Sequence, residues 1–212
     1  MILASLVLFT ILGCSNPFPD QEILYPNGLG SYDEIRHYTF DPEMILTVLD
    51  QGRGEIFEPI PDYAKSYVFP PGSFAWQQKD YLKIVGALNQ VASKETLEDW
   101  EIFLMIFARN CADNPVGFDD LRITYFKTDG DQYTTQEIDV YPLAKGAEWG
   151  GNASFPRPFL SGWKSVDLEK MKVTADDALQ MAEANGGEKA RLAAKNQCKI
   201  LESLSFNLGK VY

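Results

Sequence analysis

The stretch "WEIFLMIFA", residues 100–108, decides the fold. Side chains alternate between the two faces of a β-strand, and here both alternating sets are apolar. One set is Trp100, Ile102, Leu104 and Ile106, and the other is Phe103, Met105 and Phe107. A strand that is apolar on both faces is typical of the interior of a covered sheet. We therefore predict a central strand with structure on each side of it.

Two further strands follow it along the chain. "LRITYFK" and "YTTQEIDVY" flank the segment "TDGDQ", residues 128–132, in which Asp129-Gly130 predicts a hairpin turn. The letters D-G-D also occur in calcium loops. Because the alternating ligands and the closing Glu of such a loop are absent, we predict a plain turn.

An amphipathic helix is predicted over residues 73–92. Its apolar residues recur at helical spacing, with Ser73 as a candidate cap: Tyr81, Ile84, Val85, Leu88 and Val91. A short helix after Asp41-Pro42 and strands over residues 35–40 and 67–69 are further expectations.

A second clear helix is predicted over residues 175–185. Thr174 is its N-cap, Asp177 completes a capping box, and Asn185-Gly186-Gly187 ends it. The strand "CKILESLSF", residues 198–206, follows. The predicted fold class is α+β, an antiparallel sheet with two amphipathic helices packed on it. Because a helix precedes a strand twice, a duplicated helix–strand unit is a further expectation.

Residues 141–163, rich in Gly and Pro, are predicted to form a long loop. Long loops are often functional, so its aromatic and basic residues form a candidate binding surface: Trp149, Phe155, Arg157, Phe159 and Trp163. The alternative is that these aromatic side chains pin the loop onto the core.

The N-terminal run "MILASLVLFTILG", residues 1–13, is apolar but shorter than the roughly 20 residues that span a bilayer. Ile11, Leu12 and Gly13 before Cys14 resemble the lipobox of bacterial lipoproteins. The resemblance implies cleavage before Cys14, acylation of its sulfur and a lipid anchor outside the cytoplasmic membrane. An ordinary signal peptide or a buried strand is the alternative.

The domain organisation follows from that interpretation. Residues 1–13 are the predicted signal peptide, and residues 14–30 are the lipidated cysteine and a polar tether with prolines. Residues 31–212 form one globular domain, or two halves, 31–142 and 163–212, joined by a loop over 143–162. In an oxidising compartment, Cys111 and Cys198 are free to form a disulfide; two separate buried thiols are the alternative.

Composition excludes several function classes. The net charge of −11, from 30 acidic and 19 basic residues, repels nucleic acid. The single histidine, His37, lies in no nucleophile motif, and three scattered cysteines do not make a zinc site. We therefore predict no catalytic residues, no metal and no cofactor.

Residues 173–187 resemble the start of PepSY-like domains, in which a helix packs on antiparallel strands. The matching positions are Val173, Thr174, Ala178, Leu179, Met181 and Ala182. That family is linked to protease inhibition and extracytoplasmic binding, and it has no catalytic residues to carry over. The resemblance therefore implies a binding role.

Three functions remain open at the level of the sequence. The first is a lipid-anchored extracytoplasmic module that binds a protein or a small molecule without catalysis. The second is a hydrolase with paired carboxylates, whose densest acids are Glu98, Asp99, Glu101, Asp119 and Asp120. The third is a structural role in assembly of the cell envelope.

Overall fold

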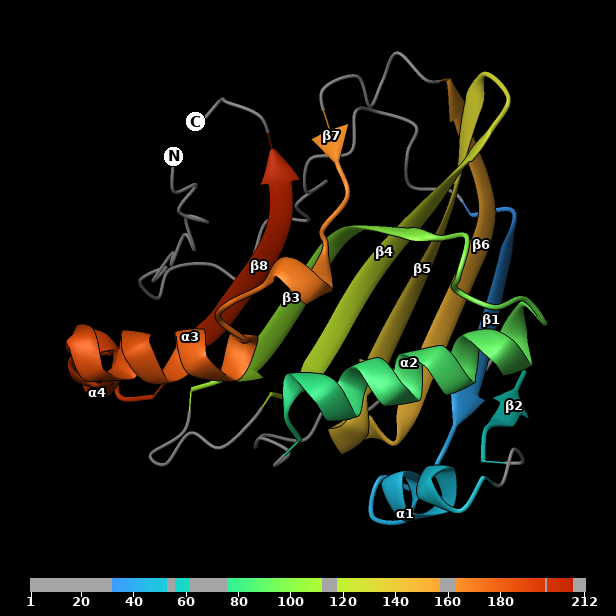
Figure 1. The fold of residues 1–212 in the computed structure, drawn as a ribbon. Coiled ribbons are helices and arrows are strands. Elements are labelled where there is room, and N and C mark those ends of the chain that lie inside the picture. Colours follow the sequence, from blue (N-terminus) through green and yellow to red (C-terminus); the bar gives the residue numbers. More distant parts are fainter. Residues whose placement is uncertain are drawn as a thin grey trace.

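The fold is α+β, with helices on one face of an antiparallel sheet, as predicted (Figure 1). It is seen in a computed structural model that describes residues 32–52, 56–61, 76–111, 118–156, 163–196 and 198–207. The predicted signal peptide, Cys14 and the tether lie outside these residues, as do the strand expected over 67–69 and the candidate cap Ser73. No helix in the described ranges is long and apolar enough to cross a membrane.

The described sheet has eight strands in the order β2-β1-β6-β5-β4-β3-β8-β7. Strands β3 to β6 form a meander, and β1 and β8 join its two sides. The bounds are β1 Glu34–Thr39, β2 Glu58–Ile60, β3 Glu101–Asn110, β4 Asp120–Asp129, β5 Gln132–Tyr141, β6 Gly146–Pro156, β7 Trp163–Lys164 and β8 Lys199–Asn207. The hairpin predicted at Asp129-Gly130 is confirmed as the β4–β5 turn.

Strand β3 lies inside the sheet, between β4 and β8, as predicted for a central strand, and the described helices cover one of its two faces. Its alternation is interrupted because the register with β4 shifts between Ile102 and Leu104. Ile102 lies opposite Tyr125 and Met105 opposite Ile123, so both face the helices. The expectation that Ile102 and Leu104 share a face is therefore wrong, and a β-bulge is the reason.

Helix α2, Gln78–Ala92, supplies much of the core over the meander. Tyr81, Ile84, Val85 and Leu88 are fully buried, as the periodicity predicts, whereas Val91 is 37% exposed. The helix begins at Gln78 and uses Gln77 and Asp80 as a capping box. Helix α1, Ile45–Asp50, starts later than Asp41-Pro42, although the Asp41 carboxylate does accept a hydrogen bond from the Glu43 amide.

Helix α3, Ala175–Ala182, begins as predicted, with Thr174 and Asp177 forming its capping box. It also ends as predicted, because Asn185 and Gly186 leave helical geometry and Gly186 adopts a positive φ of 113°. The unpredicted feature is a second helix, α4 (Glu188–Ala193), which follows directly after this segment, η5 (Glu183–Gly187). The chain therefore kinks between two helices at Gly186.

The N-termini of α2 and α3 meet (Figure 1). The Gln78 amide donates to Oδ2 of Asp176 at 3.0 Å, and the Ala175 amide donates to Oε1 of Gln78 at 2.7 Å. The first amides of a helix have no partner within the helix. Each helix therefore provides an acceptor for the first amide of the other.

The long loop expected over residues 141–163 is wrong for most of its length. Residues 142–144 form a 3₁₀ turn, Lys145 adopts a φ of 52°, and β6 then pairs with both β1 and β5. Glycines that resemble loop residues in the sequence therefore lie inside a sheet. Gly150 packs under Tyr32, where an added Cβ would lie 2.8 Å from the ring.

Candidate functional site

Trp149 is a core residue and does not belong to an exposed binding surface. Its side chain is only 3% exposed, and its Nε1 donates to Oε1 of Gln136 at 3.0 Å. The Arg36 guanidinium lies 5.3 Å from the centre of its ring. The prediction that placed Trp149 in a binding loop is wrong because β6 turns this residue toward the helices, opposite Ile138.

For the other residues of that surface, the structure describes at most the backbone. Phe155 lies in β6 opposite Tyr133, and Trp163 lies in β7 opposite Asn207. Arg157 and Phe159 fall outside the described residues. A candidate site must therefore be sought elsewhere.

The disulfide between Cys111 and Cys198 is confirmed, with Cα atoms 5.1 Å apart. Cys111 directly follows β3, and Cys198 directly precedes β8. The Cys111 amide also donates to the Cys198 carbonyl at 2.8 Å. A bridge across two paired strands fits an oxidising, extracytoplasmic compartment.

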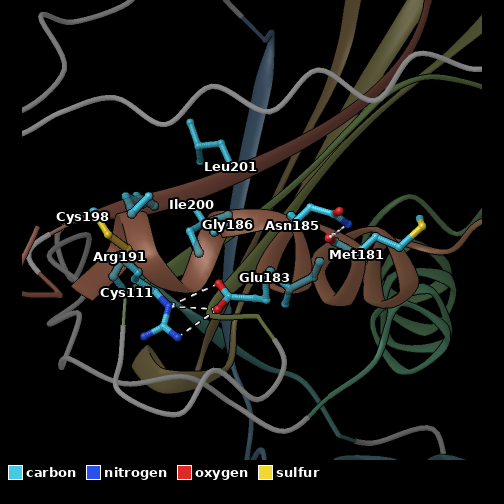
Figure 2. A pocket seen from close by; sticks show the side chains of 14 residues that line it. Cys111, Met181, Glu183, Asn185, Gly186, Arg191, Cys198, Ile200 and Leu201 are labelled. Atoms are coloured by element: carbon cyan, nitrogen blue, oxygen red, sulfur yellow. Dashed lines mark hydrogen bonds and ion pairs between the residues drawn. A yellow bond between two sulfur atoms is a disulfide. The ribbon is translucent and has the colours of Figure 1, made fainter. Parts of the chain in front are cut away.

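A cavity of about 480 Å³ lies beside this bridge, between β8 and the segment α3–η5–α4 (Figure 2). We call it the disulfide cavity. Its lining is mostly apolar: Cys111, Leu179, Met181, Ala182, Glu183, Asn185, Gly186, Gly187, Ala190, Arg191, Cys198, Lys199, Ile200 and Leu201. The volume falls in the range of roughly 300–1,000 Å³ that small-molecule pockets occupy.

The helical kink shapes this cavity. Asn185 donates from Nδ2 to the Met181 carbonyl at 2.7 Å, and Gly186 turns the chain with its positive φ. Nη2 of Arg191 in α4 donates to Oε2 of Glu183 at 2.9 Å, across the kink (Figure 2). The ion pair therefore holds α4 at a fixed angle to α3 over the cavity.

Two charged side chains are buried on the face of the sheet that the helices cover. Arg109 is fully buried, and among the described residues none accepts a hydrogen bond from its Nε, Nη1 or Nη2. Glu202 is 4% exposed, and within the same ranges neither carboxyl oxygen has a hydrogen-bond partner. Burial, and then the charge of Asp176, raises the pKa of Glu202 to about 8.

A second cavity, of about 400 Å³, has a polar lining, and we call it the aspartate cavity. Its lining residues are Asn110, Asp119, Asp120, Arg122, Tyr141, Leu143, Ala144 and Lys199. Oδ2 of Asp119 accepts from the Asn110 amide, whereas Oδ1 is buried without a hydrogen-bond partner in the described structure. Burial raises the pKa of Asp119 to about 6, and it also raises that of Asp120.

The cations of the aspartate cavity are paired. Arg122 donates from Nε to Oδ1 of Asp139 at 2.8 Å, and Asp139, more than any other group, raises the pKa of the guanidinium. Nζ of Lys199 lies 3.5 Å from Oδ2 of Asp120.

His37, on β1, contacts Oε2 of Glu148 with Nδ1 at 3.1 Å. Of the densest acids in the sequence, Asp119 and Asp120 come together here, while Glu98, Asp99 and Glu101 are exposed.

The disulfide cavity was not predicted from the sequence, because part of its wall is helix α4, which was not expected. One signal of the cavity is present in the sequence: Cys198, one of the two bridged cysteines, follows the Asn185-Gly186-Gly187 segment by eleven residues. No group of His, Cys, Asp or Glu in the described ranges could hold a metal ion.

Comparisons with family models, with curated proteins and with solved structures find no match.

Proposed function

We propose that the protein is a lipid-anchored extracytoplasmic module that binds an apolar small molecule in the disulfide cavity, without catalysis. The observation that carries this proposal is the apolar lining of a cavity large enough for a ligand. Burial of apolar surface is the main source of affinity in such sites. Met181, which is 49% exposed and lines the cavity, offers an adaptable contact at its wall.

Two observations support the proposed location outside the cytoplasmic membrane. A bridged cysteine pair fits an oxidising compartment. The lipobox resemblance around Cys14 supports anchoring through acyl chains. We expect labelled palmitate to be incorporated into the wild-type chain in bacterial cells but not into Cys14→Ala. Equal labelling of the two forms would contradict the anchor.

Binding can be tested with an uncharged apolar dye. The full chain carrying Cys14→Ser, which prevents acylation, is titrated with N-phenyl-1-naphthylamine while its fluorescence is followed. Ala190→Trp fills the cavity, because Ala190 is part of its wall. Ala193→Trp is the matched control, because Ala193 is exposed on the same helix and does not line the cavity.

The Ala190→Trp variant should bind the dye about tenfold more weakly, since one lost apolar side-chain contact weakens binding by this order. Ala193→Trp should bind like the parent chain. Circular dichroism confirms that both variants fold. Equal dye affinity of Ala190→Trp and the parent chain, or no dye binding by the parent chain, would contradict the proposed site.

A second function, hydrolysis with paired carboxylates, is favoured by one observation. The carboxyl group of Asp119, with a raised pKa and an unpaired Oδ1 among the described residues, borders the aspartate cavity beside Asp120. A carboxyl group with a pKa near 6 can act as a general acid. This function requires two carboxyl groups placed on either side of a glycosidic bond.

This second function predicts slow hydrolysis of aryl glycosides that is lost in Asp119→Asn. Asp99→Asn, at an exposed acidic position, is the control. Release of nitrophenol from a panel of nitrophenyl glycosides at pH 5–7 measures the activity. Hydrolysis that persists in Asp119→Asn, or no hydrolysis by the parent chain, would exclude this role for Asp119.

A further inference from the structure

We infer that the protein binds an extended peptide, which adds a strand to the outer edge of β8 and places an apolar side chain in the disulfide cavity. The inference rests on the proposed function, because this side chain occupies the cavity that takes the small apolar molecule. It goes beyond that function by assigning a second surface, the backbone edge of β8, and a polypeptide partner. Two observations carry it: the unpaired edge of β8 and the position of the cavity along it.

The two sides of the described sheet differ in how they are protected against further strands. One side ends in β2, which has three residues and contains Pro59. On the other side, β7 pairs only with Phe206 and Asn207 of β8 (Figure 1). Residues 199–205 therefore have no neighbour on their outer side among the described strands. Short edge strands and prolines prevent strand addition, and β8 has neither feature.

The outer edge of β8 presents a regular row of backbone hydrogen-bonding groups. In an antiparallel sheet, alternate residues of a strand direct their amide and carbonyl to one neighbour, and the residues between them direct theirs to the other side. The Cys111 amide donates to the Cys198 carbonyl in register with the β3–β8 pairing, so the even-numbered residues of β8 bond to β3. The amides and carbonyls of Lys199, Leu201 and Ser203 therefore point outward, where no described strand pairs with them.

The disulfide cavity lies along this edge. Its lining includes four consecutive residues on the β8 side, 198–201. Side chains of a strand alternate between its two faces, so a cavity confined to the helix-covered face would be lined by every second residue only. The cavity therefore reaches the backbone of β8 on the side away from β3. Its opposite wall is formed by α3 and the helical segment that follows, with Leu179, Met181 and Ala190 (Figure 2).

An extended polypeptide matches both features. Its backbone directs a donor and an acceptor to one side at every second residue, at the same spacing of about 6.8 Å at which β8 presents its own groups. Every strand pair of the described sheet is antiparallel, so we expect the added strand to be antiparallel as well. The peptide residue opposite Ile200 then points its side chain into the cavity, and its two neighbours bond to Lys199 and Leu201 through their backbones.

The charge of the chain favours a separate peptide over a second copy of the protein. Two copies would each bring a net charge of −11 to the contact, and like charges oppose association. A neutral or basic peptide meets no such repulsion. Arg191 and Glu183 at the cavity wall are paired with each other and require no charged group in the ligand. The partner is therefore an extended segment with apolar residues at alternate positions and without acidic side chains.

The experiment is isothermal titration calorimetry of the full chain carrying Cys14→Ser with the blocked peptide acetyl-TLTLT-amide. Two N-methylated forms separate backbone pairing from apolar contact. One carries a methyl group on the amide of the central threonine, which faces β8 when the leucines point toward the helices. The matched control carries it on the amide of the following leucine, which faces away from β8.

Methylation at the central threonine should weaken binding about tenfold, since one backbone hydrogen bond to β8 is lost and contributes by this order. The peptide methylated at the leucine should bind like the unmethylated peptide. Bound peptide should also exclude N-phenyl-1-naphthylamine, because a leucine side chain occupies the cavity.

Two substitutions at Leu201 test the same edge from the side of the protein. Both remove the leucine side chain, but Leu201→Pro also removes the outward amide, whereas Leu201→Ala keeps it. Proline is tolerated in an edge strand where the amide it replaces faces solvent. The two variants should bind the dye equally, and Leu201→Pro should bind the peptide about tenfold more weakly than Leu201→Ala. Circular dichroism checks that both fold.

Several results would overturn the inference while leaving the proposed function intact. One is a parent chain that binds the dye but not the peptide. Another is an equal or larger loss of affinity when the leucine is methylated, and a third is equal peptide affinity of the two Leu201 variants. A dimer in analytical ultracentrifugation that dissociates in Leu201→Pro would assign the edge to a second copy instead. Failure of the dye itself to bind would contradict the proposed function, so the two failures are distinguishable.

Discussion

Arg109 and Arg191 are two buried arginines with opposite surroundings. Arg191 donates hydrogen bonds to Glu183 and Asn196. Arg109 has no hydrogen-bond acceptor among the described residues, and burial lowers its pKa. A buried charge without a partner destabilises the folded state. Removing one member of a buried ion pair has the same effect, because it leaves the other charge buried and unpaired. The two residues should therefore respond differently to the same substitution.

We predict that Arg109→Met leaves the free energy of unfolding within about 1 kcal/mol of wild type or raises it. Arg191→Met should lower that free energy by about 3 kcal/mol, because it leaves the partly buried Glu183 carboxylate unpaired. Urea unfolding followed by circular dichroism measures both. A loss in Arg109→Met as large as that in Arg191→Met would show that Arg109 has a stabilising partner.

Single residues also show where sequence reasoning succeeded and where it failed. The disulfide of Cys111 and Cys198 followed from counting cysteines once Cys14 was set aside. Trp149 was misplaced because Gly150 and Gly151 resemble loop residues. Gly151 is required inside the strand because a Cβ at this position would clash with the indole ring of Trp149. That requirement depends on the folded position of the ring, which the local sequence does not encode.

At the scale of elements, α2 and α3 are coupled by their first residues. The Gln78 side chain accepts from the Ala175 amide, which belongs to a residue only 9% exposed. Without Gln78 this amide has no acceptor from α2. An unsatisfied buried donor destabilises a protein by about 1–3 kcal/mol.

Gln78→Ala should therefore lower the free energy of unfolding by about 2 kcal/mol. Gln90→Ala, on the exposed face of the same helix, should change it by no more than about 0.5 kcal/mol. Thermal or urea denaturation measures the two variants side by side. Similar losses in both would mean that only helix propensity is affected.

Elements were predicted well where local periodicity decides them. The buried face of α2, the capping box of α3 and the β4–β5 turn all follow from residues close in sequence. The pairing of β8 with β3 does not, because it joins residues 89 to 101 positions apart in the sequence. The helix end at Asn185-Gly186 also follows from local residues, whereas the short helix α4 that comes after it was not predicted.

For the whole molecule, buried carboxyl groups determine how stability depends on pH. Burial raises the pKa of Asp119 to about 6, of Glu137 to about 7 and of Glu202 to about 8. In the unfolded chain these groups lose their protons near pH 4. Between about pH 4 and pH 8 the folded state therefore binds more protons than the unfolded state, so stability falls as pH rises through this window.

We expect the urea midpoint to be higher at pH 5 than at pH 8. The free energy of unfolding should fall accordingly from pH 5 to pH 8. In Glu202→Gln this fall in free energy should be smaller by an amount on the order of 3 kcal/mol, because the raised pKa of Glu202 no longer contributes. Glu188→Gln, at an exposed position on α4, should keep the full decline. A midpoint that rises from pH 5 to pH 8 would show that these groups are ionised in the folded state.

The disulfide also determines how the molecule would respond to mechanical force. Cys111 and Cys198 are 87 positions apart in the sequence, and the described part of this segment includes four strands of the sheet and the helices α3 and α4. If the two ends of the chain are pulled apart, tension passes through the bridge and bypasses this segment. At 3.3–3.6 Å per extended residue, about 300 Å of chain stays hidden until the bridge is reduced. If the protein is anchored to a membrane through Cys14, as proposed, that hidden length would limit its reach from the surface.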